Sequence, residues 1–359
     1  MRVRSLRQLN IRNLVTERLA FGDGVTAVVG PNATGKSNLL EALTLGLEGR
    51  GAGSRIADSL RFGCEEGYVR VDLETSDGAH TVEVGLAPGH KRVQLDGQAV
   101  RALELGRLGG VVLVSPEDLD LVHGPPARRR AFLDHLLGRL SLRYGLLVRA
   151  YHRVVDQRNA LLREGDPSAM LATWDVRFLA LGEEVHALRA RAAVPLAAHA
   201  TAAYDRIAGG THHLEVRLER SGPAGALAQA LAATAAAERA RGATQVGPHR
   251  DDLALRLGGR SLQAYASRGE ARTVALALRV AERALLEARH GEPPLLLIDD
   301  VHAELDERRR RFLVALAEAA PQAIVTSTEP PSGATRVWTM DGGRVDTAAI
   351  GGTEVAGGA

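Results

Sequence analysis

Residues 24–43 read GVTAVVGPNATGKSNLLEAL, and this stretch decides the fold. The valine-rich run at 24–30 predicts a short buried strand that ends in glycine. The leucines that follow recur at helical spacing, at Leu39, Leu40, Leu43 and Leu47. Between strand and helix, GPNATGKS at 30–37 matches the pattern G-x-x-x-x-G-K-[ST]. A glycine turn matching this pattern by chance is the alternative, and it is disfavoured because the strand and helix lie where the motif requires them.

Such a loop binds a polyphosphate, because its glycines let successive N–H groups and the helix N-terminus face one anion. Lys36 is expected to reach the β- and γ-phosphates, and the Ser37 hydroxyl to ligate Mg²⁺. The expected nucleotide-binding residues are Gly30, Pro31, Asn32, Ala33, Thr34, Gly35, Lys36, Ser37 and Asn38.

An acidic partner for the metal is expected at the end of another buried strand. PLLLIDD at 294–300 supplies Asp299 to hold Mg²⁺ and Asp300 to polarise an attacking water. Taken alone, an apolar run ending in aspartates is more often a strand emerging into solvent. The phosphate-binding loop reverses that preference.

Composition indicates a folded chain of about two domains, since 359 residues with 45% hydrophobic and 25% charged side chains exclude a disordered or collagen-like protein. The absence of a long apolar run or an apolar leader predicts a cytoplasmic protein without a membrane segment, and the single Cys64 fits a reducing compartment. The net charge of +2 does not by itself indicate nucleic acid as a partner. Only Lys36 and Lys91 are lysines, so nearly all the positive charge is arginine.

Periodicity divides the chain into an α/β part at 1–120 and 243–359 and an inserted, all-helical lobe at 121–242. After residue 242, apolar runs alternate with helical patterns, which implies a mostly parallel sheet. The phosphate-binding loop at 30–37 and Asp299 are far apart in the sequence, and this separation places the lobe between two halves of one sheet. The closing GGTEVAGGA at 351–359 has nothing to bury and is expected to be disordered.

YASRGEART at 265–273 lies before an amphipathic helix and then the aspartate pair. This order resembles the ABC-type ATPases, whose signature segment binds the γ-phosphate of a nucleotide held by another subunit. Ser267, Arg268, Gly269 and Glu270 correspond to the signature core. Without that resemblance, Ser267 and Glu270 form an ordinary helix capping box, and both interpretations can hold together.

Several segments narrow the resemblance to the RecF family, across essentially the whole chain. They are LNIRNL, GPNATGKSNLLEAL, SPEDLDLVHGPPARRRAFLD, QRNALL, TQVGPHRDDL, the signature and LLLIDDVHAELD. The resemblance implies an α/β ABC-type P-loop ATPase head that binds ATP with Mg²⁺, pairs head to tail with a second copy and hydrolyses ATP weakly, stimulated by DNA. It also implies binding to duplex DNA near gaps or stalled forks, and help in loading RecA together with RecO and RecR during DNA repair, replication and the SOS response.

Some positions depart from the wider ABC pattern. Asp300 stands where transporters carry a glutamate, and SPEDL offers Glu117 or Asp118 where a glutamine is usual. Hydroxyl residues replace an expected histidine, at Thr326, Ser327 and Thr328. A hydroxyl can hydrogen-bond a phosphate but does not carry a proton near pH 7.

Two further clusters have weaker interpretations. Arg128, Arg129 and Arg130 could grip DNA phosphates, pair with acids or line a contact of the lobe, and a structural role is favoured. His249 with Asp251 and Asp252 is favoured as a polar turn rather than a metal site. Aromatic residues are only 3% of the chain, so a base-stacking platform is disfavoured and a duplex backbone is the better DNA target. The arginines of the first strand, Arg2, Arg4, Arg7 and Arg12, have no assigned role.

Three rival functions stay in view: an ABC transporter subunit, an SMC-like head without a direct DNA role, and a small-molecule kinase. The missing histidine and the large lobe oppose the first. Salt-dependent binding of duplex DNA separates the second from the favoured function. No sequence element indicates the substrate pocket that the third requires.

Overall fold

A computed structural model describes residues 1–51, 56–165, 169–210, 212–223, 225–300 and 306–348. The chain forms two compact units, one of residues 1–116 and 286–359 and one of residues 117–285. No helix of the described residues combines the length and the apolarity that a bilayer span requires. The expected disorder at 351–359 lies outside the described residues.

A mostly parallel sheet in the first unit confirms the expected α/β pattern. Its strand order is β15-β14-β3-β13-β12-β8. Neighbouring strands are parallel except the edge pair β14 and β15. The bounds are β3 Gly24–Val29, β8 Val111–Val114, β12 Leu295–Ile298, β13 Gln322–Ser327, β14 Arg336–Asp341 and β15 Arg344–Asp346. All four residues of β12 are buried, as a strand covered on both faces requires.

The other sheet of this unit is antiparallel, in the order β2-β1-β4-β5-β6-β7. Its strands are β1 Arg2–Leu9, β2 Arg18–Ala20, β4 Gly67–Thr75, β5 Gly78–Ala87, β6 His90–Leu95 and β7 Gln98–Ala99. Asp96 and Gly97 form the turn of a hairpin between β6 and β7, with φ of 52° and 78°. Two successive positive φ values are typical of the tight turns whose twist matches the strands.

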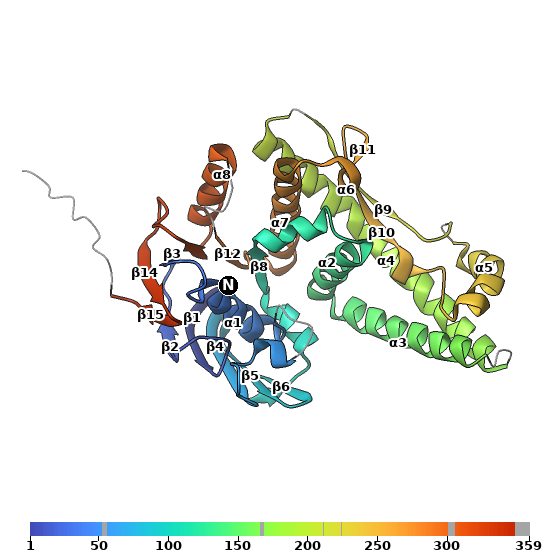
Figure 1. Cartoon of the computed structure of the whole chain (residues 1–359), viewed down its shortest axis with the longest axis horizontal. Coiled ribbons are helices and arrows are strands. Elements are labelled where there is room, and N and C mark those ends of the chain that lie inside the picture. The colour runs from blue at the N-terminus through green and yellow to red at the C-terminus, as the bar shows by residue number, and fades with distance from the viewer. Residues whose placement is uncertain (52–55, 166–168, 211, 224, 301–305, 349–359) are drawn as a thin grey trace, which may run out of the picture. The chain divides into compact units, whose positions relative to one another are not determined.

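Helix α1, Lys36–Glu48, contacts strands of both sheets (Figure 1). Its leucines are buried together with Val69, Val71, Val82 and Val84 from the antiparallel sheet in one hydrophobic core. At Gly46 an added Cβ would lie 2.4 Å from a methyl group of Val71, so only glycine lets helix and strand approach so closely. Helix α8, Glu307–Glu318, contacts β3 and β13. Short 3₁₀ turns cover Ile56–Ser59 and Ala102–Leu108.

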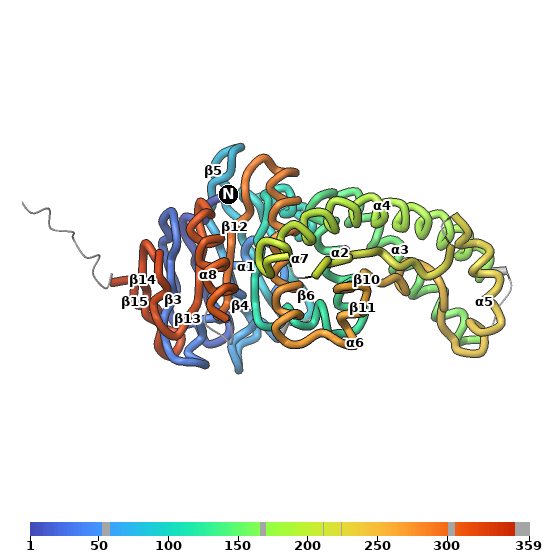
Figure 2. The backbone as a smooth tube through the Cα atoms, turned by 90° about the horizontal axis from the view of Figure 1, so that it is seen from above, coloured from blue at the N-terminus to red at the C-terminus, as the bar shows by residue number. Residues whose placement is uncertain are grey.

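The second unit is built mainly from helices. They are α2 Pro126–Leu140, α3 Leu142–Glu164, α4 Ala169–Ala208, α5 Leu227–Arg241, α6 Leu262–Tyr265 and α7 Arg268–His290, which continues past the boundary of the unit. Helices α3 and α4 lie side by side (Figures 1 and 2). Apolar residues at helical spacing are buried, including Phe132 and Leu136 on α2 and Tyr151 and Val155 on α3. Turns at Pro116–Leu121 and Pro248–Arg250 complete the unit.

Two sequence expectations were wrong in this unit. The stretch at 214–219, expected to be helical, is strand β9. The first apolar run after residue 242, LALRL at 253–257, lies in β10, Asp252–Leu257, and does not join the parallel sheet. The two strands pair antiparallel, and β11, Arg260–Ser261, completes a three-stranded sheet. Each strand alternates apolar and charged residues, and the pairing buries one face of both. Residues 243–285 therefore pack with residues 117–242, whereas the sequence suggested a division at 242 and 243.

Candidate functional site

The phosphate-binding loop follows the central strand β3 and opens helix α1, as the motif requires. Gly35, directly before the helix, has a φ of 110°, which L side chains rarely adopt. A Cβ at Gly30 would lie 2.2 Å from the Met340 carbonyl oxygen, and one at Gly35 would lie 2.5 Å from Asn13. Both glycines are therefore required by the fold of the loop. The N–H groups of the first turn of α1 point toward this loop.

Lys36 lies inside the loop, with its side chain 7% exposed. Its ammonium donates to the carbonyl oxygens of Gly30 at 2.7 Å and Pro31 at 2.8 Å. These acceptors are neutral, so they position the ammonium without cancelling its charge. The adjacent Ser37 is exposed at the start of α1.

A second segment, which the sequence did not assign to the site, braces the loop. Asn13 donates through its Nδ2 to the Thr34 carbonyl at 3.2 Å and accepts from Asn38 at 2.8 Å. Arg12 pairs with Glu41 of α1 at 2.9 Å. In the sequence, Arg12 and Asn13 were noted only as part of LNIRNL, one of the segments that resemble the RecF family. Their contacts were not predicted, because no local pattern reveals which distant loop an asparagine will contact.

The acidic edge of the site comes from β12 and β13. Parallel strands end at one edge of a sheet, and β12 is separated from β3 only by β13. Thr326 of β13, fully buried, donates to Asp299 Oδ1 at 2.6 Å and accepts from the Asp300 N–H at 2.8 Å. Its hydroxyl therefore orients the Asp299 carboxylate and fixes the backbone of Asp300. The sequence placed Thr326 in the position of a missing histidine but did not predict this contact.

Left-handed backbone gathers at the same loops. Five non-glycine residues of the described chain have positive φ, and four of them, Asn10, Arg12, Ala33 and Asp300, lie in the bracing loop, the phosphate loop or the strand end after Asp299. Non-glycine residues in this region carry strain of about 1 kcal/mol or more, and such strain collects at functional sites.

These residues fit Mg²⁺ bound with a nucleotide. The donors are a hydroxyl and a carboxylate, which are the oxygen ligands that Mg²⁺ prefers, and this ion usually takes one or two protein ligands with the rest from phosphates and water. Among the described residues, no group of three or more His, Cys, Asp or Glu could hold a metal alone. Ser37 and Asp299 are accordingly the residues that would hold it.

The signature segment lies in the second unit, at the start of α7. The Ser267 N–H donates to Glu270 Oε2 at 2.8 Å, and the Glu270 N–H donates to Ser267 Oγ at 3.2 Å. These two bonds confirm the predicted capping box, and the hydrogen bonds from Ser267 lower the pKa of Glu270. Ser267 and Arg268 are exposed, while Gly269 is partly covered.

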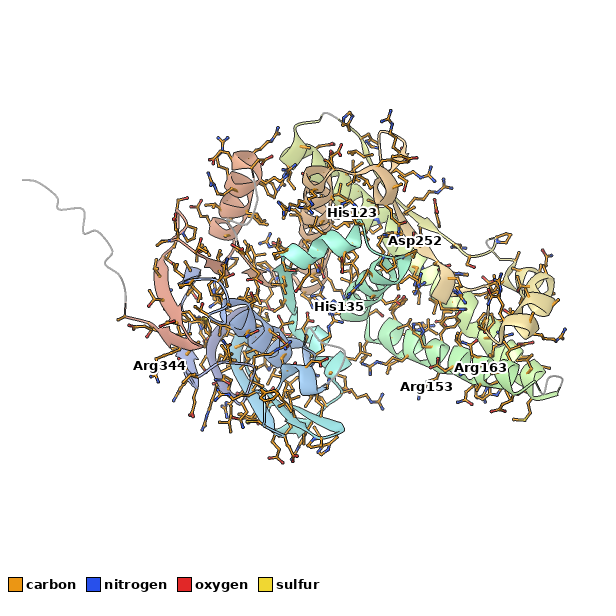
Figure 3. The ribbon with its side chains drawn as sticks, in the orientation of Figure 1. His123, His135, Arg153, Arg163, Asp252 and Arg344 are labelled. Atoms are coloured by element: carbon orange, nitrogen blue, oxygen red, sulfur yellow. The ribbon has the colours of Figure 1, made fainter. Side chains whose placement is uncertain are left out.

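Of the three arginines considered for DNA, two serve the fold. Arg129 is 3% exposed and forms two parallel bonds to Asp252, labelled in Figure 3, at 2.7 and 2.8 Å. Arg130 donates to the Asp251 carbonyl at 2.7 Å, and burial lowers its pKa. Arg128 stays exposed, 3.5 Å from Asp120. A contact between DNA and Arg129 is therefore excluded by burial, which supports the structural interpretation.

Asp118 is also occupied within the second unit. It accepts from Arg279 at 2.6 Å, and Arg279 also reaches Glu282, which pairs with Arg139. Asp118 and Glu282 are buried. This series of ion pairs joins the turn at 116–121 to α2 and α7. The Asp118 carboxylate therefore serves the fold. Glu117 is exposed beside it.

The segments QRNALL and GPHRDDL meet in a buried polar core of the second unit. Arg158 bonds to Asp175, Thr244 and Glu238 at 2.8, 2.6 and 3.1 Å. Arg189 binds Asp134 and Asp251 at 2.9 and 3.0 Å. Asp251 also accepts from His186 at 3.0 Å. We call this set, with His249, the arginine core.

His249 belongs to the arginine core and not to a metal site. Its Nδ1 lies 2.8 Å from the Tyr151 hydroxyl, and its Nε2 lies 3.2 Å from the Thr244 carbonyl. A carbonyl only accepts, so Nε2 carries the proton and Nδ1 accepts from Tyr151. Burial lowers the pKa of His249 to about 4. The polar turn favoured from the sequence is thus supported by every contact of this ring.

Comparisons with known proteins agree with this geometry. The sequence pattern of the family described as the RecF/RecN/SMC N-terminal domain matches residues 2–335. A DNA replication and repair protein RecF of Deinococcus radiodurans is 46% identical over 344 residues, covering 96% of this chain and 95% of that protein.

Solved structures give the same result. The recombination mediator protein RecF with ATP, of the RecFOR pathway, matches with a TM-score of 0.90 and 28% identity, over 97% of this chain and 98% of that chain. An Smc head domain from Pyrococcus furiosus matches with a TM-score of 0.57 and 17% identity, over 97% and 96% of the two chains, which is a likeness of fold alone. The expected ABC-type ATPase head fold is confirmed.

Proposed function

Because the chain belongs to the RecF family, we propose that it is an ATP-dependent DNA-binding protein of recombinational repair. It binds duplex DNA near gaps or stalled forks and helps to load RecA together with RecO and RecR in the cytoplasm. Two copies pair on ATP, and weak, DNA-stimulated hydrolysis releases them. As a functional division, the ATPase head comprises residues 1–120 and 243–359 and the inserted lobe comprises residues 121–242, although residues 243–285 pack with the lobe.

The phosphate-binding loop of this proposal holds the triphosphate. The backbone N–H groups between Asn32 and Asn38 bind its oxygens, and Lys36 turns its ammonium from the loop carbonyls toward the β- and γ-phosphates. Mg²⁺, held by Ser37 and Asp299, would neutralise charge between these phosphates. Thr326 keeps the Asp299 carboxylate oriented for that role.

Asp300 is the residue that acts on the attacking water. Its carboxylate orients the attacking water, and its shorter side chain, compared with glutamate, suits slow turnover. Ser267 to Glu270 of a second copy bind the γ-phosphate from the far side, since a serine hydroxyl and the first N–H groups of α7 are anion-binding groups. Dimerisation therefore depends on nucleotide.

One observation carries the proposal most: the only charged side chain inside the loop, Lys36, is buried on neutral carbonyl oxygens. A buried ammonium without a carboxylate is costly unless an anion joins it. The loop is therefore arranged for a phosphate ligand.

The chain's second lysine provides a matched test. Lys36→Met removes the loop ammonium, whereas Lys91→Met makes the same change at an exposed residue of β6. We expect Lys36→Met to lose ATP binding, the ATP-dependent dimer and DNA retention, measured by calorimetry, sedimentation and gel shift. Lys91→Met should retain all three. A Lys36→Met protein that still dimerises on ATP would contradict the proposal.

The role of Ser267 is separated from its capping role by choice of side chain. Aspartate caps a helix as well as serine does but places a negative charge against the phosphate. Ser267→Asp and Ser267→Arg should both bind ATP nearly as well as the natural chain and yet fail to form the dimer. An unchanged ATP dimer in sedimentation would exclude the cross-subunit contact.

A further inference from the structure

The outward face of the antiparallel sheet carries several arginines, and only some of them are paired with acids. Cross-strand register places Arg7 of β1 directly opposite Arg18 of β2 on one side and Arg70 of β4 on the other. Residues directly opposite in a sheet share a face. The inward face is the buried one, with Leu6, Val69 and Val71 in the core, so these three arginines point away from α1.

Arg92 extends this face across the sheet. It lies opposite Gly85 of β5, which lies opposite Tyr68 of β4 and thus in the row of Leu9. A Cβ added at Gly85 would meet nothing within 4 Å, so the floor between Tyr68 and Arg92 is open. Strands lie about 4.8 Å apart, and the cations thus span roughly 19 Å from β2 to β6.

The charges on this face differ in their partners. Arg70 is held by Asp72 at 3.0 Å and lies 3.9 Å from Glu83. At the far end of β1, Arg2 lies 3.5 Å from Asp23 and Arg4 reaches Asp23 and Glu74 at 2.8 and 2.6 Å. Within the described chain, Arg7, Arg18 and Arg92 have no ion-pair or hydrogen-bond partner and all are exposed. We call these three the free arginines.

Like charges directly opposite one another in a sheet destabilise it. Arg7 and Arg18 nevertheless face each other, although acids neutralise the other end of the same strand. The fold gains nothing from this pair, so its charge is available to an external anion. Guanidinium groups repeated along a surface suit the phosphates of a nucleic acid backbone.

We infer that the free arginines form a binding surface for the phosphate backbone of duplex DNA. The inference rests on the proposed function and names the surface through which it acts. A link to the nucleotide is present in the same unit: β1 ends at Leu9, and the loop that follows braces the phosphate-binding loop through Asn13. The surface reads no base sequence, because its contacts are to phosphate.

Two double variants test this inference on one face of one sheet. Arg7→Gln with Arg18→Gln removes two free arginines, and Arg2→Gln with Arg4→Gln removes two that are paired with acids. Binding of a labelled duplex is followed by fluorescence anisotropy with ATP and Mg²⁺ over a series of KCl concentrations.

We expect the first variant to bind DNA at least about tenfold more weakly and the slope of log K against log salt to become shallower by about 2, since each lost phosphate contact removes about 0.9. The second variant should keep the natural slope. The melting temperature of the first variant should not fall, whereas a structural role for the pair would lower it.

The outcomes are distinguishable. A natural slope in the first variant overturns the inference while DNA binding stands. Failure of the natural chain to bind duplex DNA overturns the proposed function and the inference with it. Binding to phosphatidylserine vesicles instead of DNA, lost in the first variant, would assign the surface to a membrane and overturn the inference as well.

Discussion

The phosphate-binding loop of the first unit and the arginine core of the second each hold a buried cation, but the two cations have opposite kinds of partner. Lys36 rests on two backbone carbonyl oxygens, and no carboxylate partners it among the described residues. Arg189 is held by two carboxylates and a hydroxyl, and this holds its pKa above the usual value.

This contrast separates a cation kept for a ligand from one used by the fold. A buried arginine with two carboxylates has its hydrogen bonds and its charge satisfied. A lysine on neutral acceptors keeps an attraction for anions. The free arginines resemble Lys36, since their charge is left for a ligand. Arg129 resembles Arg189, since its charge is used by the fold. Partners therefore indicate function better than residue type does.

The largest expected effect comes from breaking the arginine core. Arg189→Met leaves Asp134 and Asp251 without their guanidinium, and Asp251 is fully buried. Removing one partner of a buried pair costs about 3–5 kcal/mol. We expect a loss of that size in the free energy of unfolding, measured with urea.

Arg143→Met is the matched control. It breaks an exposed ion pair of the second unit, between Arg143 of α3 and Glu184 of α4, in which the arginine side chain is 81% exposed. Exposed pairs contribute about 0–1 kcal/mol. Equal losses in the two variants would contradict the distinction drawn between buried and exposed arginines.

A smaller effect is expected from pH. His249 has a pKa of about 4 in the folded chain against 6.5 when unfolded. Below pH 6.5 the unfolded chain takes up a proton that the folded chain refuses, so the stability contribution of neutral His249 is present above pH 6.5 and falls toward pH 4. The loss is about 2 kcal/mol by pH 5.

The measurement compares the natural chain with His249→Gln. Other titrating groups are common to both, so the difference between their unfolding free energies should shrink by about 2 kcal/mol between pH 7.5 and pH 5. A difference independent of pH would mean that the ring titrates alike in both states.

The smallest change in stability is expected at two buried threonines of neighbouring strands. Thr326→Val removes the hydroxyl that orients Asp299 and leaves the Asp300 N–H unpaired, for a loss of about 1–2 kcal/mol. Its larger consequence, given the proposed function, is a 10- to 100-fold weaker apparent affinity for Mg²⁺ in ATP hydrolysis, as is usual when an orienting partner of a ligand is lost.

Thr26→Val is the control on β3. The Thr26 hydroxyl is fully buried and has no hydrogen-bond partner among the described residues, so its removal should leave stability unchanged or raise it. Hydrolysis by this variant should respond to Mg²⁺ as the natural chain does. A loss of Mg²⁺ affinity at Thr26 would show that the effect at Thr326 is general to the sheet.

The parts of the site that could be predicted are those written in continuous sequence. The loop at 30–37 carries its own strand, glycines and helix, so its geometry follows from local pattern. The capping box of Ser267 and Glu270 is equally local. The fold of the first unit was predicted well because buried strands and leucine spacing leave few alternatives.

Contacts between distant segments could not be predicted. Thr326 meets Asp299 only because β13 lies beside β12, and strand order is not written in either strand. Strand β9 was missed because α5 separates it in the sequence from its partner β10. Alternation over six residues is also a weak signal. A structural role was favoured for Arg129, but its partner Asp252 could not be named, because it lies 123 residues away in the sequence.

Helix α1 has a consequence for local unfolding. It begins at the phosphate-binding loop and its Gly46 presses against Val71 of the sheet that bears the free arginines. Opening β4 would uncover the helix, so helix and strand belong to one cooperative unit of amide exchange. A ligand that closes on the start of α1 should thus slow exchange along β4 and β5, on strands that never touch it.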